Sequence, residues 1–406
     1  MAFQPLTTQF GSASVHSGRG IAPGPRMGLK LIPRVSQASV FGHRRLPLHY
    51  RKFGRRSSVL GVHACASTNG SSSVQAVCLG EGLFDMLADQ FDVPRDKVTS
   101  WTPHAGGAPC NVSAALAKLG ISVAFASAVG KDDMGDDLLR ILKASGVDLS
   151  DVQRTAEPTR DVYVTRTSGG EREFSGFGLP ANQYGDCFLD VDALPIERIQ
   201  GADVLITGTL GLAYPATGKA MRRAVKKALA GNTLVMVDVN WRPVFFADPG
   251  EETKKDIAEF VKLADIVKLT DEECEWLFGL DASTIIQSPC EVRKHLPNAK
   301  GVLVTGGEKG AGFCFDNDGT DVTGYIPVFD IDVIDTTGAG DAFTAGFVYQ
   351  LLNAGGVDNL LKEAGALERA VRFASACGGL TTTKAGAIEG QPTLESVVEL
   401  AATQVA

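Results

Sequence analysis

Residues 331–347 read IDVIDTTGAGDAFTAGF, and this stretch predicts a strand that breaks directly into a helix. The Val and Ile residues of its first half favour extended backbone, and apolar residues at helical spacing follow the break. Gly338, Ala339 and Gly340 leave the junction almost bare of side chains, which lets a ligand approach the backbone amides. Asp341 is either a functional carboxylate beside a bound anion or a first-turn acid favoured by the helix dipole.

Around this junction, short β-branched segments alternate with amphipathic ones. Strands are expected at residues 74–80, 121–130, 202–210, 233–240, 264–270 and 301–307. Helices are expected at residues 109–120, 132–145, 216–232 and 252–264, with Asp132 as an N-cap. This order predicts an α/β domain with a mostly parallel central sheet covered by helices on both faces. In such a sheet, ligands bind beyond the carboxyl ends of the strands.

Two segments interrupt the alternation. Residues near 91–105 and residues 161–176 look like a small β appendage, and the second contains a Gly-Gly turn between alternating runs, which predicts a β-hairpin. No internal repeat is present. The sequence therefore predicts one α/β domain with a β lid.

The N-terminal segment has a different composition from the rest. Residues 1–80 contain ten Lys or Arg and no Asp or Glu, and they are rich in Ser, Gly and Pro. This predicts an organelle transit peptide over residues 1–66 followed by a linker at 67–73. A basic arm for nucleic acid is the alternative. The sequence VHACA at 62–66 resembles a chloroplast processing site, so the chloroplast stroma is expected, with the mitochondrion as second choice.

The remainder is acidic, with 29 basic against 47 acidic residues and a formal net charge of −18. Such a body is a poor general binder of polyanions, so direct binding of nucleic acid is not expected. No apolar run is long enough to predict a membrane span. The eight Cys form no C-x-x-C pair and are expected to be buried, reduced thiols, with a redox-controlled disulfide as the alternative. Only His104 and His295 lie beyond residue 66, which leaves proton transfer to a carboxylate.

Common nucleotide-binding signatures are absent. The sequence contains no G-x-x-x-x-G-K-[ST], no G-x-G-x-x-G after a strand and no protein-kinase H-R-D set. Instead, DTTGAGDAF at 335–343 resembles a signature of the ribokinase/fructokinase (PfkB) family of sugar kinases. GGAPCNV at 106–112 resembles the second signature of this family, and GEGLFD at 80–85 and DVNWRP at 238–243 resemble its fructokinase branch. The resemblance covers residues 74–401 and implies a ribokinase-like fold with a β lid.

The resemblance also implies a mechanism. Asp341 would accept the proton of the sugar hydroxyl, while the amides of residues 338–341 would hold the transferring phosphoryl group. Sugar binding would fall to the following residues of the N-terminal half: Asp85, Gly106, Gly107 and Asn111. A helix cap is the alternative role for Asn111. Arg172 in the lid hairpin would reach the substrate or simply face solvent.

Phosphate, metal and nucleotide roles are implied in the same way. Arg242 would contact the transferred phosphate or the substrate, with Asp238 and Asn240 in the metal–water network. Lys268 would reach the phosphates, and Glu273 would orient Mg²⁺ through water, although Thr270 stands where the family usually has Asn. The nucleotide would lie along a loop and a helix that contribute Thr305, Gly307, Gly310 and Ser375, the last again in place of a more usual Asn. Backbone oxygens of Asp335 and Thr337 are candidates for a monovalent cation such as K⁺.

These roles imply an ATP- and Mg²⁺-dependent kinase for fructose at its primary hydroxyl. Two alternatives remain open. One is a kinase for another sugar or a nucleoside, and the other is a non-catalytic fructokinase-like subunit of a plastid transcription or nucleoid assembly. The lid could also pair two copies into a homodimer.

Overall fold

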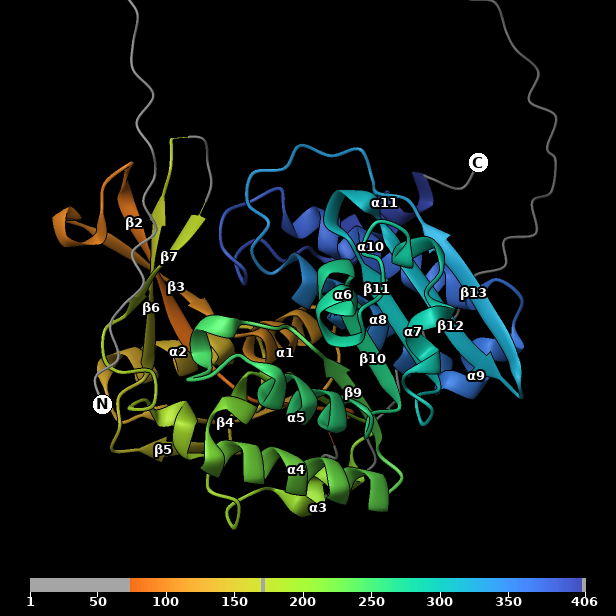
Figure 1. The fold of residues 1–406 in the computed structure, drawn as a ribbon, viewed down its shortest axis with the longest axis horizontal. Coiled ribbons are helices and arrows are strands. Elements are labelled where there is room, and N and C mark those ends of the chain that lie inside the picture. Colours follow the sequence, from red (N-terminus) through yellow and green to blue (C-terminus); the bar gives the residue numbers. More distant parts are fainter. Residues whose placement is uncertain (1–73, 169–171, 404–406) are drawn as a thin grey trace, which may run out of the picture. The chain divides into compact units, whose positions relative to one another are not determined.

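The computed structural model describes residues 74–168 and 172–403, which belong to one compact unit (Figure 1). The predicted transit peptide and linker, at 1–73, lie outside the described residues. No helix within the described residues is long and apolar enough to cross a membrane.

The central sheet has nine strands in the order β13-β12-β11-β10-β9-β8-β1-β4-β5. Neighbours from β11 through β10, β9, β8, β1 and β4 to β5 are parallel, and β12 and β13 add an antiparallel edge. Its strands are β1 (Ala76–Leu79), β4 (Val123–Gly130), β5 (Val152–Thr155), β8 (Val204–Thr207), β9 (Leu234–Asp238), β10 (Ile266–Thr270), β11 (Gly301–Thr305), β12 (Ala311–Asn317) and β13 (Thr320–Ile326). The predicted mostly parallel sheet is confirmed.

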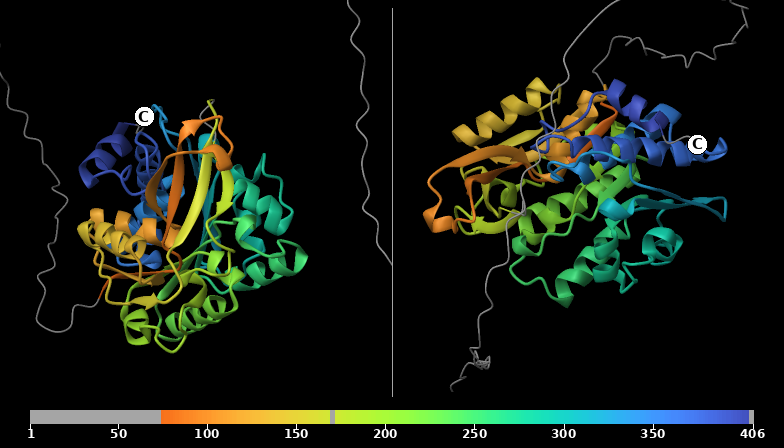
Figure 2. Two further views of the ribbon diagram at one scale, coloured as in Figure 1. Left: turned by 90° about the vertical axis from the view of Figure 1, so that its left-hand side faces the viewer. Right: turned by 90° about the horizontal axis from the view of Figure 1, so that it is seen from above.

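Helices cover both faces of this sheet, as Figure 2 shows with gold and blue helices on one side and green and teal helices on the other. The first layer consists of α1 (Ala108–Lys118), α2 (Asp133–Ala144), α8 (Ala339–Ala354), α9 (Val357–Lys362), α10 (Ala366–Thr381) and α11 (Leu394–Thr403). The second consists of α3 (Ile196–Gly201), α4 (Pro215–Ala230), α5 (Glu251–Val261), α6 (Asp271–Phe278) and α7 (Cys290–Lys294). Buried strand residues alternate between two cores: Ala76 and Cys78 of β1 face the first layer, whereas Val77 and Leu79 face the second.

A second sheet forms the predicted lid, in the order β3-β2-β6-β7. Its strands are β2 (Leu83–Phe91), β3 (Trp101–Gly106), β6 (Arg160–Arg166) and β7 (Arg172–Phe177). The hairpin predicted at 161–176 is confirmed, although its Gly-Gly turn lies outside the described residues. The segment near 91–105 contains β3 and the connection that leads to it from β2. Because only three residues separate the end of β1 from the start of β2, the lid stands next to the carboxyl end of the central sheet (Figure 1).

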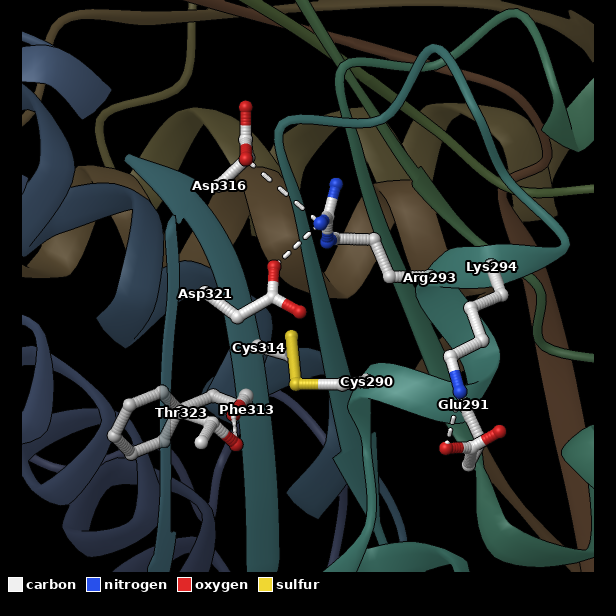
Figure 3. The surroundings of a disulfide bond; sticks show 9 residues. All are labelled: Cys290, Glu291, Arg293, Lys294, Phe313, Cys314, Asp316, Asp321 and Thr323. Atoms are coloured by element: carbon white, nitrogen blue, oxygen red, sulfur yellow. Dashed lines mark hydrogen bonds and ion pairs between the residues drawn. A yellow bond between two sulfur atoms is a disulfide. The ribbon is translucent and has the colours of Figure 1, made fainter. Parts of the chain in front are cut away.

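Two expectations about local structure are wrong. The run at 331–337 is not a strand, because the chain leaves the sheet after β13 and Val333 and Ile334 are 60% and 70% exposed. The cysteines are not all reduced thiols, since Cys290 of α7 is bonded to Cys314 of β12 (Figure 3). The helix start predicted at Asp132 is confirmed, because its carboxylate accepts a hydrogen bond from the Gly135 amide at 2.7 Å.

Candidate active site

The two sequence signatures meet in space through one hydrogen bond. Asn111 Nδ2 in α1 donates to Asp341 Oδ2 at the start of α8 over 2.8 Å, although the residues are 230 positions apart. Asn111 lies inside α1, and Gly107 occupies the N-cap position, so the alternative role of Asn111 as a helix cap is wrong. Asn111 instead orients the carboxylate of Asp341.

The turn before α8 requires glycine. Gly338 is the N-cap with a φ of 79°, and a Cβ there would lie 2.8 Å from Ala387. A Cβ on Gly340 would lie 3.1 Å from the Nζ of Lys268. The Ala339 amide donates to the Thr336 carbonyl at 3.2 Å, so among the amides predicted to bind phosphate, this one already has an acceptor. The first N–H groups of a helix lack intrahelical acceptors, which leaves the remaining amides suited to an anion.

The Asp341 carboxyl is an unusually weak acid for an aspartate. Burial raises its pKa to about 6, and the Asp238 carboxylate adds to this effect. The Asn111 hydrogen bond and the positive charges of Lys268 and Arg242 act in the opposite direction. A carboxylate with a pKa near the working pH is better suited to accept a proton than an ordinary aspartate.

Asp85 of the lid strand β2 is the second carboxylate of the site. Burial raises its pKa to about 6, and the charges of Arg172, Arg242 and Asp341 all act on it. The predicted sugar-binding carboxylate therefore lies close to the predicted base. Arg242 is exposed, and its Nη1 donates to the Trp241 carbonyl at 2.8 Å.

The Gly pair of the GGAPCNV signature, Gly106 and Gly107, lies where side chains would collide with neighbouring atoms. A Cβ on Gly107, whose φ is 98°, would lie 2.6 Å from the Glu81 carbonyl oxygen, and one on Gly106 would lie 3.0 Å from Asp85 Oδ2. Glu81 itself was not predicted as a site residue. It is buried, it accepts the Ala108 amide at the start of α1, and burial raises its pKa to about 7. Its place directly after β1 is the signal that could have found it.

A buried ion pair lies beneath α8. Lys268 of β10 and Asp238 of β9 are 3.0 Å apart and almost fully buried, and Thr344 of α8 donates to the same carboxylate. Burial alone would lower the pKa of Lys268, but Asp238 and Glu273 hold it above its usual value. Lys268, which we predicted to reach the phosphates, is thus anchored by Asp238 beside Gly340.

Glu273 has a clear structural role. Together with Thr270, it forms a capping box at the start of α6, and its other oxygen accepts the Trp241 amide at 2.6 Å. Thr270, which stands in place of the family's Asn, therefore acts as the helix cap.

The predicted nucleotide residues come from two elements. Thr305 ends β11, and Gly307 and Gly310 follow with φ values of 56° and 86°. A Cβ on Gly310 would lie 2.4 Å from the Ile326 carbonyl oxygen. Ser375 is half-buried on α10, and within residues 74–168 and 172–403 no hydrogen bond joins its side chain to the glycine loop.

Arg172 does not face solvent freely. Its side chain is 32% exposed, but it donates to Thr337 Oγ1 and to Asp335 Oδ2, so it is a paired charge at the surface. Asp335 and Thr337, which we predicted to offer backbone oxygens to a cation, contact the lid through their side chains.

Comparison with known proteins decides the family. The profile described as pfkB family carbohydrate kinase matches residues 74–394. The chain belongs to this family. It is 34% identical over 328 residues to probable fructokinase-2 of Arabidopsis thaliana, covering 80% of this chain and 95% of that protein. It is 33% identical over 350 residues to probable fructokinase-6, chloroplastic, of the same plant, covering 85% of this chain and 86% of that protein.

A solved structure agrees. Fructokinase with bound ATP from Xylella fastidiosa superimposes with a TM-score of 0.71 at 27% identity, covering 82% of this chain and 99% of that one. The predicted ribokinase-like fold is confirmed, and the protein is a carbohydrate kinase.

The carboxylates of this kinase suit a hydrated divalent cation. The Asp238 carboxylate acts to raise the pKa of both Glu273 and Asp341, and Lys268 forms an ion pair with Asp238 at 3.0 Å. All three carboxylates already accept protein donors, so a metal ion would be held mainly through water, as Mg²⁺ prefers.

Proposed function

We propose that this sugar kinase transfers the γ-phosphoryl group of ATP to the primary hydroxyl of fructose. The observation that carries this proposal is the Asn111–Asp341 hydrogen bond, which brings the sugar-binding signature and the phosphoryl-transfer signature together. The names of the relatives support fructose as the substrate.

In this proposal, Asp85, Asn111 and the side-chain-free surface at Gly106 and Gly107 hold the sugar. A carboxylate and an amide can accept from and donate to adjacent hydroxyls. Asp341 receives the hydroxyl proton, and its pKa of about 6 keeps it mostly ionised at neutral and alkaline pH while leaving it basic enough to accept that proton.

The phosphoryl group would be bound by the amides at the start of α8, with Lys268 and Arg242 as nearby positive charges. Thr305, Gly307, Gly310 and Ser375 would line the nucleotide. Mg²⁺, when bound through Glu273 and Asp238, would neutralise phosphate charge during transfer. The acid-free N-terminal segment and the chloroplastic relative support a location in the chloroplast stroma.

The test is ADP release by the chain from residue 67 onward, measured with ATP and Mg²⁺ across ketoses, aldoses and nucleosides. We expect the highest kcat/KM with fructose. Turnover with a different acceptor would show that this acceptor, and not fructose, is the substrate, while the proposed phosphoryl transfer would still hold. An absence of turnover with every acceptor, in a folded protein, would favour the non-catalytic alternative.

A further inference from the structure

An ion pair joins the lid sheet to the body of this kinase beside the turn at the start of α8. Arg172 lies on β7 of the lid, and Asp335 lies in the loop that leads to α8. Arg172 Nη2 contacts Asp335 Oδ2 and Nη1 contacts Thr337 Oγ1, each at 2.5 Å. The Asp335 side chain is only 4% exposed, so this contact is not an ordinary surface salt bridge.

Both oxygens of the Asp335 carboxylate already accept two hydrogen bonds each. Its Oδ1 accepts the amide and the hydroxyl of Thr337 at 3.0 and 2.7 Å, and its Oδ2 accepts the Gly386 amide at 2.9 Å as well as Arg172. A carboxylate offers about four lone-pair sites. All four are therefore filled, and a metal cation at this carboxylate would have to displace the guanidinium.

Asp335 also connects the two loops that shape the anion-binding turn. It lies three positions before Gly338, and through the Gly386 amide it holds the loop whose next residue, Ala387, packs against Gly338. A lid residue that binds Asp335 therefore acts directly on the wall of the predicted phosphoryl site.

We propose that Arg172 is a positioning residue that locks the lid onto this wall and supplies a fixed positive charge at the Asp335 carboxylate, beside the backbone oxygens that the family resemblance assigns to a monovalent cation. The guanidinium is charged at every physiological pH and binds two oxygens at once. The lid is then held over the sugar without K⁺, and water is kept from the γ-phosphate. The expected change in sugar-dependent turnover rests on the proposed function, whereas the expected change in melting temperature does not.

The experiment compares four proteins in KCl and in tetramethylammonium chloride at equal ionic strength: the unaltered chain, Arg172→Ala, Arg172→Lys and Arg166→Ala. Arg166 is the matched control, because it lies in the same lid sheet but donates to the Ala88 carbonyl within that sheet. Melting temperature without substrates, sugar-dependent ADP release and sugar-free ADP release are measured for each protein.

The unaltered chain and Arg166→Ala are expected to behave alike in the two salts. Arg172→Ala should lose roughly tenfold or more in sugar-dependent turnover, because the turn is displaced. Its melting temperature and its turnover should both be higher in KCl than in tetramethylammonium chloride, because K⁺ can now reach Asp335. Arg172→Lys should keep the charge but not the second contact, giving intermediate turnover and no response to K⁺.

The proposal is overturned if K⁺ raises the melting temperature of the unaltered chain as much as that of Arg172→Ala, or if Arg172→Ala behaves like the unaltered chain in both salts. If no protein turns over a sugar, the proposed function fails, while the melting temperatures in the two salts still decide the role of Arg172.

Discussion

Replacing Asp341 by Asn should abolish turnover while making the protein more stable. Asn keeps the shape of the side chain and an oxygen that can accept the Asn111 amide, but it cannot take up a proton. Loss of a positioned base costs about 10²- to 10⁴-fold in rate. We therefore expect kcat to fall within or beyond that range, with little change in ATP affinity.

The stability change follows from the pKa of Asp341. Its native pKa of about 6 lies above the ordinary aspartate value of 3.8, so the native state binds this proton more tightly than the unfolded state does. The contribution of this proton to the free energy of unfolding is fully present below pH 3.8 and is lost as the pH rises through about 6. This contribution is at most about 3 kcal/mol of the free energy of unfolding. An uncharged Asn does not ionise, so the variant avoids this loss at pH 7.

Both parts can be measured with one variant and one control. Urea unfolding at pH 7 should show a higher free energy of unfolding for Asp341→Asn, and the gain should shrink toward acidic pH. In the unaltered enzyme, kcat/KM should fall below pH 6 as Asp341 becomes protonated. Asp133→Asn, at the exposed start of α2, should change neither rate nor stability by much. Near-normal turnover of Asp341→Asn, or a loss of stability at pH 7, would refute the reasoning.

Three further outcomes are expected. Lys268→Met should lower the free energy of unfolding by about 3–5 kcal/mol in a urea titration, because it leaves the Asp238 charge buried and unpaired, and adding Asp238→Asn should recover part of this loss. Reduction of the Cys290–Cys314 bond, which closes a loop with a sequence separation of 24, should lower the free energy of unfolding by about 3 kcal/mol. A variant with both of these cysteines replaced by Ser should melt at the same temperature with and without dithiothreitol. Gly338→Ala should lose turnover with intact α/β circular dichroism, because a φ of 79° strains an L-residue; unchanged turnover would contradict the role of this turn.

Most strands of the central sheet can be predicted from the local sequence pattern, and the wrong predictions have local causes. Periodicity located the buried parallel strands, because each is apolar on both faces. The run at 331–337 also contains Ile and Val, but Ile334 and Asp335 donate their amides to the Thr382 carbonyl, and no strand pairs with them within the described residues. The hairpin of β12 and β13 was missed, although its Asp318-Gly319 turn is a recognisable signal.

The sequence by itself determined that α8 begins with a turn bare of side chains and suited to an anion, followed by one carboxylate, because helix starts and glycine conformations depend mainly on neighbouring residues. It did not determine what surrounds that carboxylate. The contacts of Asp341 with Asn111 and of Asp335 with Arg172 join residues 230 and 163 positions apart. Only the tertiary structure decided these contacts and the raised pKa of Asp341, because burial and charge at one atom depend on every segment that packs around it.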